Sequence, residues 1–339
     1  MRNAILRWTD GVVLLDKPRG ISSQKAVTLV KHACGADKAG HTGTLDPLAT
    51  GLLAVCLGEA TKYSQDLFNS DKSYIATLLF GVKTDTGDSE GKIIARAPEP
   101  TEQFKEIFTD QLQHIVPRFL GQIAQVPPMY SAIKKDGRPL YAYAREGEMF
   151  DLEARQVQIT ELEVLSCAWP VAVLKVSCSK GTYIRSLISD IGDALGVGAH
   201  MTELRRTRIG HLKLADAQTL DEVKSDFKMM QVDSLITHVP AIVLEHHTAL
   251  RLKMGQRIHV RDVLTQMDDP ILQSPLLRIY HLQHSTEQFM GLVEQKNGVL
   301  HPKRLLATDR LEHVLEQPLL APHFSIDTSI KHHSHSSHF

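Results

Sequence analysis

The chain has 339 residues, enough for more than one hydrophobic core. Its 42% hydrophobic and 23% charged residues are typical of a soluble globular protein, and no apolar run approaches the ~20 residues that a membrane helix needs. Four widely separated cysteines without metal-ligand spacing indicate a reducing compartment, and charged residues near the N-terminus exclude a signal peptide, so we expect a cytoplasmic protein.

The N-terminal part predicts a strand followed by a helix. The apolar run Gly11–Leu15 is a short strand that stops at the sequence Asp-Lys-Pro. Ser22 or Ser23 can cap a helix that runs to about His32.

The next stretch, from Gly40 to Leu53, starts polar and glycine-rich, presents one carboxylate, and then becomes apolar. Pro47 disfavours the α conformation for Asp46, so Asp46 should lie on an extended loop. The run Leu52–Leu57 predicts a buried strand directly after it. A carboxylate on a shaped loop beside a rigid strand is a common arrangement for a catalytic group. Asp-Pro with flanking glycines is also ordinary turn chemistry, so these properties alone leave a structural role open.

Further along, the patterns predict a helix over Glu59–Phe68 and a central strand over Ser73–Phe80. Thr101 caps an amphipathic helix whose apolar residues recur at helical spacing and are best explained as core contacts. A polar excursion then covers about residues 127–152, with basic and aromatic residues interleaved. It is either a surface hairpin with a helix or a mobile arm.

The last part of this region predicts strands at Val157–Leu165 and Val171–Ser177, a helix over Tyr183–Leu195 capped by Thr182, and a basic strand over Arg205–Gly210. Hairpins are present, and no glycine-rich phosphate loop occurs. We therefore predict an α+β domain over residues 1–244, built around a large mixed or mostly antiparallel sheet.

From about residue 245 the composition changes. Short β-like runs alternate with turns, which predicts a small β-rich module over residues 245–312. Residues 328–339 are rich in His and Ser; metal binding is one interpretation, but we expect a disordered tail.

The net charge is only −1, but the charges are unevenly distributed. Residues 1–45 hold seven Lys/Arg against three Asp, and residues 174–213 hold seven Lys/Arg against three acids. Residues 81–110 hold four bases and seven acids. The basic segments indicate a local surface for a polyanion, although solvated faces with chance clustering would look similar.

Six blocks of sequence, in order, resemble the TruB family of tRNA pseudouridine synthases. The longest is the run from Gly40 to Leu53. The others begin at Leu15-Asp16-Lys17-Pro18, Lys72-Ser73-Tyr74, Pro127-Pro128-Met129-Tyr130, Gly181-Thr182-Tyr183-Ile184-Arg185 and Gly198-Ala199-His200-Met201, the last running on to Leu204-Arg205-Arg206. Together they cover roughly the first 240 residues, too many in register to arise by chance. The module after residue 245 resembles the family's C-terminal PUA domain only by position and by Met254-Gly255-Gln256-Arg257.

The resemblance implies a site as well as a fold with a central cleft. Asp46 matches the family's nucleophile, and Arg185 matches its ion-pair partner. Tyr74 matches the tyrosine that stacks on the target uracil. Tyr183 matches a second aromatic residue of the pocket, and Leu204 matches an apolar wall against the base. Lys17 matches a supporting lysine, and His41 matches a histidine that takes the place of the uridine in the base stack. Taken singly, the aromatic residues would more often belong to a core and the histidine to a turn. Matched in register with Asp46 and Arg185, the set favours the site instead.

The implied function is isomerisation of the T-loop uridine at position 55 of tRNA to pseudouridine. Because the reaction needs no redox change and no external energy source, we expect no cofactor and no metal. We expect the T arm of tRNA as the partner, a monomeric protein, and no association with a membrane. The excursion over residues 127–152 would be the segment that the family calls its "thumb". Two alternatives stay open: a catalytically idle RNA-binding protein or RNA-folding chaperone, and a guide-dependent synthase of the dyskerin type. A chaperone role could also accompany catalysis. The chemistry leaves open whether Asp46 attacks C1′ of the sugar or C6 of the base.

Overall fold

The computed structural model describes residues 9–131, 133–263, 270–283 and 286–311. The chain divides into two compact units, Met1–His238 and Val239–Phe339. Among the helices in the described ranges, none combines the length and apolar character that crossing a bilayer requires.

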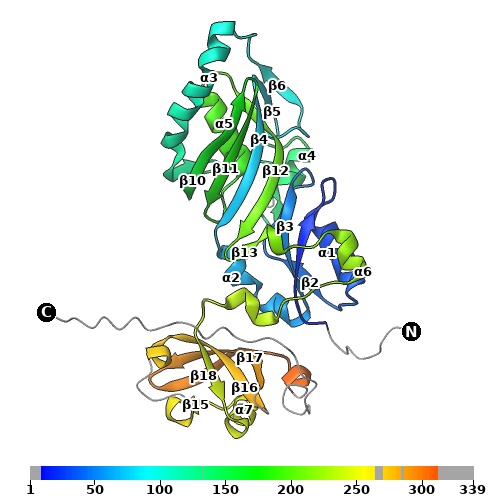
Figure 1. Ribbon diagram of the computed structural model, residues 1–339, viewed down its shortest axis with the longest axis vertical. Coiled ribbons are helices and arrows are strands. Elements are labelled where there is room, and N and C mark those ends of the chain that lie inside the picture. The colour runs from blue at the N-terminus through cyan, green and yellow to red at the C-terminus, as the bar shows by residue number, and fades with distance from the viewer. Residues whose placement is uncertain (1–8, 132, 264–269, 284–285, 312–339) are drawn as a thin grey trace, which may run out of the picture. The chain divides into compact units, whose positions relative to one another are not determined.

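The first unit is built on a nine-stranded sheet (Figure 1), as the α+β prediction expects. Its main path runs β1-β3-β12-β4-β11-β10-β7; β2 pairs with β3, and β13 pairs with β12. All of these pairings are antiparallel except β12 with β3, which makes the sheet mixed. The strands are β1 (Gly11–Lys17), β2 (Ala39–His41), β3 (Thr50–Leu57), β4 (Lys72–Phe80), β7 (Gly121–Gln125), β10 (Arg155–Ala168), β11 (Val171–Cys178), β12 (Ala199–Ile209) and β13 (Leu212–Lys213).

Two layers of helices cover this sheet. Helices α3 (Glu102–Ile115) and α5 (Ile184–Ala194) pack on the β4, β10, β11 and β12 strands over one apolar core. Strand β4 turns Tyr74, Ala76, Leu78 and Phe80 into that core because alternate residues of a strand share a face. Helices α1 (Ser23–Ala33) and α6 (Leu220–Ser225) pack on β1 and β3 over a second core.

The caps of the helices follow the sequence in two cases and depart from it in one. Ser22 and Thr101 cap α1 and α3, accepting hydrogen bonds from the Lys25 and Phe104 amides. Thr182 does not cap α5, so that prediction is wrong: its hydroxyl donates to the Ser179 carbonyl, and the N-cap residue is Tyr183.

The helix predicted over Glu59–Phe68 is also divided. The chain forms a 3-10 helix, η1 (Gly58–Tyr63), and then the α-helix α2 (Ser64–Asn69). The Thr61 and Ser64 hydroxyls donate to carbonyls three residues earlier, at Gly58 and Thr61. Such local bonds favour the tighter 3-10 turn.

The remaining elements of the first unit lie outside the large sheet. The two hairpins are β5 (Val82–Thr84) with β6 (Ile93–Arg96), and β8 (Lys134–Lys135) with β9 (Arg138–Pro139). The β8–β9 turn places Asp136 and Gly137 at positive φ, as a two-residue hairpin turn requires. With α4 (Leu140–Arg145) it forms the 127–152 excursion. The short 3-10 helices are η2 (Val116–Phe119), η3 (Leu214–Asp216) and η4 (Val232–Ile236).

The second unit is a five-stranded sheet in the order β14-β16-β17-β18-β15. Its elements are β14 (Ala241–Leu244), α7 (His246–Lys253), β15 (Ile258–His259), η5 (Val260–Asp262), η6 (Pro270–Gln273), β16 (Leu276–Gln283), β17 (Thr286–Lys296) and β18 (Val299–Leu305). The division after His238 falls earlier than the domain end expected at residue 244, because β14 pairs with β16. The tail predicted at residues 328–339 lies outside the described residues.

Candidate active site

The loop between β2 and β3 carries Asp46 and is held from several sides. The Ser23 hydroxyl donates to the Leu45 carbonyl at 2.8 Å, and the Leu45 amide donates back to it at 2.7 Å. The Gly20 amide donates to the Pro47 carbonyl at 2.8 Å. These hydrogen bonds fix the backbone on both sides of Asp46, and the Asp46 side chain remains 39% exposed.

Arg185 links Asp46 to a second carboxylate. It lies in the first turn of α5, and its guanidinium is 3.1 Å from the Asp46 carboxylate and 3.4 Å from that of Asp88. It also donates to the Thr86 and Tyr130 carbonyls, at 3.0 and 2.7 Å. Because Arg185 is almost fully buried and bonded on several sides, it presents a fixed positive charge to Asp46.

Three further side chains singled out in the sequence lie near the Asp46 carboxylate. Its charge acts on Tyr74, Tyr183 and Lys17. Burial raises the pKa of Tyr74, and it also raises the pKa of Tyr183. Leu204 belongs to the same apolar cluster as Tyr74. Both phenols are thus protonated at neutral pH, and Tyr74 lies beside an apolar wall.

Lys17 is fully buried and donates to the Pro18 and Ile21 carbonyls at 3.0 and 2.8 Å. Burial lowers the pKa of Lys17 to about 8, although Asp46 opposes the shift. Lys72 is held in the same way by the Phe68 and Ser70 carbonyls, and burial lowers its pKa to about 8. The lysines are structural cations, bonded to backbone oxygens rather than directly to a carboxylate.

His41 ends β2 and turns towards the loop. The Gly43 amide donates to its Nδ1 at 3.3 Å, so a neutral ring carries its proton on Nε2. Burial, and then the charge of Arg206, lower the pKa of His41. The imidazole is therefore uncharged at neutral pH.

Two residues of the site, Arg206 and Asp88, had no assigned role in the sequence. Arg206 is 1% exposed and donates to three carbonyls of the loop region, those of Gly43, Thr44 and Leu52. The signal for a buried Arg206 that the sequence did offer is the pair Arg205-Arg206 within a predicted strand. Neighbouring strand residues face opposite sides, so one of the two had to point inward.

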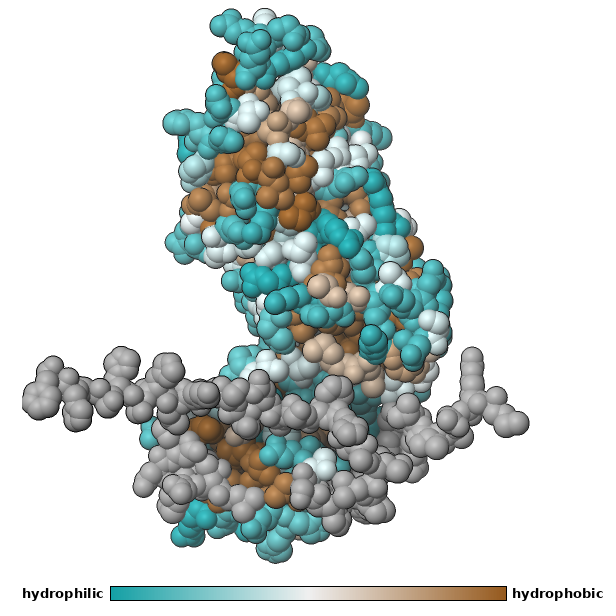
Figure 2. All heavy atoms as spheres, viewed as in Figure 1, coloured by the Kyte–Doolittle hydropathy of each residue, from teal (hydrophilic) through white to brown (hydrophobic). Residues whose placement is uncertain are grey.

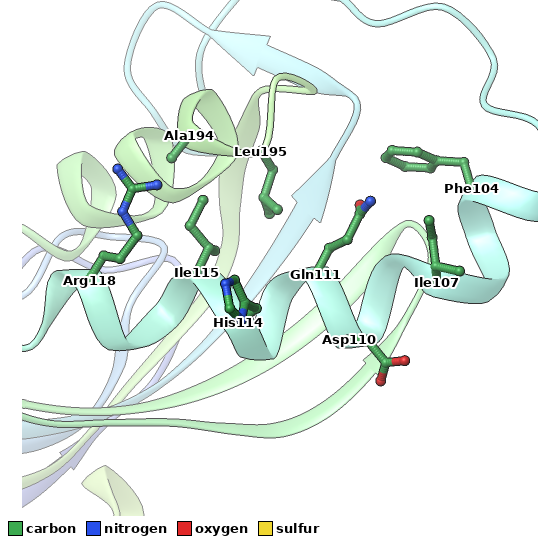
Figure 3. Close-up of a pocket in the computed structure, with 9 residues that line it drawn as sticks. All are labelled: Phe104, Ile107, Asp110, Gln111, His114, Ile115, Arg118, Ala194 and Leu195. Atoms are coloured by element: carbon green, nitrogen blue, oxygen red, sulfur yellow. The ribbon is translucent and has the colours of Figure 1, made fainter.

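A groove elsewhere on the first unit contains none of the predicted site residues. Side chains from α3, from η2 and from the end of α5, among them Phe104, Ile107 and Arg118, line a groove of about 640 Å³ (Figure 3). Hydrophobic residues gather on the surface of the first unit in this region (Figure 2). Asp46 and Arg185 do not line the groove. In the described part of the chain, no group of three His, Cys, Asp or Glu side chains is placed to hold a metal ion.

The mixed sheet, with a loop aspartate paired to an arginine at the start of a helix, defines the fold of a pseudouridylate synthase. Family models agree along most of the chain. Residues 31–184 match the model described as "TruB family pseudouridylate synthase (N terminal domain)". Residues 185–250 match "tRNA pseudouridylate synthase B C-terminal domain", and residues 240–306 match "Pseudouridine synthase II TruB, C-terminal".

Individual relatives support the same assignment. A protein named tRNA pseudouridine synthase B from Burkholderia mallei is 44% identical over 310 residues, covering 89% of this chain and 98% of the relative. One of the same name from Cupriavidus pinatubonensis is 45% identical over 309 residues, covering 88% and 95%. The solved structure "Crystal Structure of a Cbf5-Nop10-Gar1 Complex" matches with a TM-score of 0.61 and 26% identity, covering 89% of this chain and 86% of the other. The chain belongs to the TruB family.

Proposed function

We propose that this protein isomerises a uridine of tRNA to pseudouridine, with Asp46 as the nucleophile and no cofactor. The observation that carries the proposal is the Asp46–Arg185 pair beside Tyr74 and Leu204. The relatives named tRNA pseudouridine synthase B support tRNA as the substrate. The T-loop uridine at position 55, and a monomeric enzyme acting on the T arm, are the finer parts of the proposal.

The reaction makes modest demands. The N1–C1′ bond breaks, a C5–C1′ bond forms, C5 loses a proton and N1 gains one, so the composition of the nucleotide does not change. The nucleophile is a carboxylate, and the Arg185 guanidinium holds that of Asp46 at 3.1 Å. Because Asp88 occupies the other side of Arg185, the arginine cannot turn away from the nucleophile without losing a buried partner.

The target base must leave its stack before it meets Asp46. Extrusion costs a few kcal/mol, and a neutral side chain that takes the vacated place recovers part of this cost. His41 has the required neutral ring and lies at the end of β2, directly before the loop that carries the nucleophile. Tyr74 and Leu204 supply the aromatic and apolar surfaces for the flipped uracil.

The stand-alone form is favoured over a guide-dependent one. The chain is 44% identical to proteins named tRNA pseudouridine synthase B, against 26% to the matched chain of the Cbf5-Nop10-Gar1 complex. The 127–152 excursion also carries cations stacked on aromatic rings: the Lys135 ammonium lies 3.5 Å from the centre of the Phe150 ring, and the Arg138 guanidinium 4.6 Å from that of Tyr143. Such a surface suits an RNA strand.

The test is to incubate the purified protein alone with an unmodified tRNA transcript and to map pseudouridine by primer extension after carbodiimide treatment. We expect one stop, at the T-loop uridine, without a guide RNA. A stop at another uridine would keep the chemistry and correct the position. No stop at any uridine, from a folded protein that binds the transcript, would refute the proposal.

A further inference from the structure

Arg206 is the largest fully buried side chain in the described part of the chain, yet none of the described carboxylates pairs with it at ion-pair distance. Burial lowers the pKa of Arg206, and its main opposing neighbour is Tyr74. An unpaired buried charge is costly for a fold, and a well-packed apolar residue would avoid the cost. Stability of the fold therefore does not explain why an arginine stands at this position.

The guanidinium joins the loop that carries the nucleophile to β3, the strand that follows the loop. Nη2 donates to the Gly43 carbonyl at 3.0 Å and Nη1 to that of Thr44 at 3.4 Å, both before Asp46. Nε donates to the Leu52 carbonyl at 2.8 Å, after it. A planar fork with fixed donors holds these carbonyls at a set separation, which a lysine ammonium cannot do.

The same side chain meets Tyr74. Arg206 and Tyr74 are direct partners across β12 and β4, so their side chains lie on the same face of the sheet. The phenol opposes the effect of burial on the pKa of the guanidinium. The other groups that act on the phenol hydroxyl are Cys178 on β11 and Asp46 on the loop. The backbone of Arg206 also pairs with Gly51 near the start of β3: a Cβ on Gly51, which has φ of +97°, would lie 2.3 Å from the Arg206 carbonyl oxygen. Loop, strand and phenol thus meet at one residue.

We propose that Arg206 is a positioning residue that couples the Asp46 loop to Tyr74. Its guanidinium sets the distance between the attacking carboxylate and the ring against which the target uracil stacks. The inference rests on the proposed function of this site. It assigns Arg206 no contact with the substrate.

The first experiment compares Arg206→Lys with Arg205→Lys in the full chain, by single-turnover tritium release from C5-labelled tRNA at saturating protein. Arg205 is the matched control, because it lies one residue away on the opposite face and pairs with Asp16 at the surface. Arg206→Lys should slow the rate constant about 100-fold, as expected for a misplacement of about 1 Å. Its tRNA affinity should stay within about threefold. Arg205→Lys should keep the wild-type rate, and equal rates for the two variants would overturn the proposal.

A double-mutant cycle then tests the coupling itself. If Arg206 acts through Tyr74, Arg206→Lys should slow a Tyr74→Phe protein by less than about tenfold, against about 100-fold in the wild-type background. A purely structural role would give the same factor in both backgrounds and would exclude the coupling.

A third measurement leaves Arg206 intact, in case its substitution prevents folding. Tyr74→Phe removes the hydroxyl that Arg206 faces, so amide hydrogen exchange in a peptide covering residues 42–53 should become faster by about threefold or more. Unchanged exchange there would contradict the coupling. Absence of turnover by the wild-type protein would refute the proposed function instead, and this exchange measurement would still decide the coupling.

Discussion

The two units place their charges differently. In the first unit, Lys17, Lys72, Arg185 and Arg206 are buried and donate to backbone carbonyls or carboxylates. In the second unit, the described ion pairs lie at the surface: Glu294 pairs with Lys296 and Lys303, whose side chains are 64% and 45% exposed. The core beneath them is formed by aliphatic residues such as Ile242, Leu277 and Val293.

This difference separates two uses of charge. A buried cation held by backbone oxygens keeps its position and is poorly screened by salt, so it can set the geometry of a reaction. An exposed pair contributes little to stability, and its lysine can exchange a carboxylate for an RNA phosphate. We therefore expect substitutions in the first unit to change rates, and changes in the second unit to alter affinity and its dependence on salt.

The largest effect should come from Asp46→Asn. The amide keeps the volume but cannot attack, so turnover should fall by at least about 10⁴-fold while tRNA affinity stays within about tenfold. Tritium release from C5-labelled tRNA measures the first quantity and filter binding the second. Release at a rate near that of the wild type would show that Asp46 is not the nucleophile.

Asp88→Asn should have the next largest effect and slow the single-turnover rate by about 100-fold. The substitution removes one of the two carboxylates that hold Arg185, so the arginine is less well placed for Asp46. Asp85→Asn is the matched control, because Asp85 is exposed and its carboxylate accepts from the Lys92 amide. Equal rates for the two variants would mean that the Asp88 contact is not needed.

How far the sequence could lead is clear from the same residues. Blocks far apart in the chain identified Asp46 and Arg185, and the structure brings them into contact. The periodicity of β4 and the caps Ser22 and Thr101 are local, so they too were predictable. The role of Arg206 was not, because its partners are carbonyls on another strand and loop, and carbonyls leave no trace in a sequence. The start of α5 gives a second example. The Tyr183 amide donates to the Gln125 side chain, which is distant in the sequence, whereas the hydroxyl of the neighbouring Thr182 donates to the Ser179 carbonyl and does not cap the helix.

Lys17→Met tests the buried charge through pH. Burial lowers the pKa of Lys17 from 10.5 to about 8, so the folded protein holds fewer protons than the unfolded chain between these values. The contribution of Lys17 to stability is therefore least favourable below pH 8 and improves as the pH rises to 10.5. The stability of the wild type relative to Lys17→Met should rise by up to about 3 kcal/mol over that window. Denaturant unfolding at pH 7.5, 9 and 10.5 measures it, with the exposed Lys25→Met as the control. A difference that does not change with pH would contradict the burial of this charge.

His41→Ala should have an effect of about tenfold, and only on folded RNA. An intact T arm must have the vacated stack filled, whereas an unstructured oligonucleotide has no stack to fill. Single-turnover rates on both substrates give the comparison. Equal slowing on both would place the action of His41 in the chemical step.

The smallest effect concerns the second unit as a whole. A chain that ends at His238, where the first unit ends, should still isomerise the same uridine, because Asp46, Tyr74, Tyr183 and Arg185 all lie before that point. Its affinity should fall by roughly fivefold, and the slope of log affinity against log salt should become shallower, since fewer phosphates are neutralised. Removing the second unit could also destabilise the first, so the truncated chain must show a cooperative unfolding transition before its binding is compared. A folded truncated chain with an unchanged slope would remove RNA binding from the second unit. If it folds and binds but forms no pseudouridine, the second unit must help to build the active site, and the separation of charge uses argued above would fail.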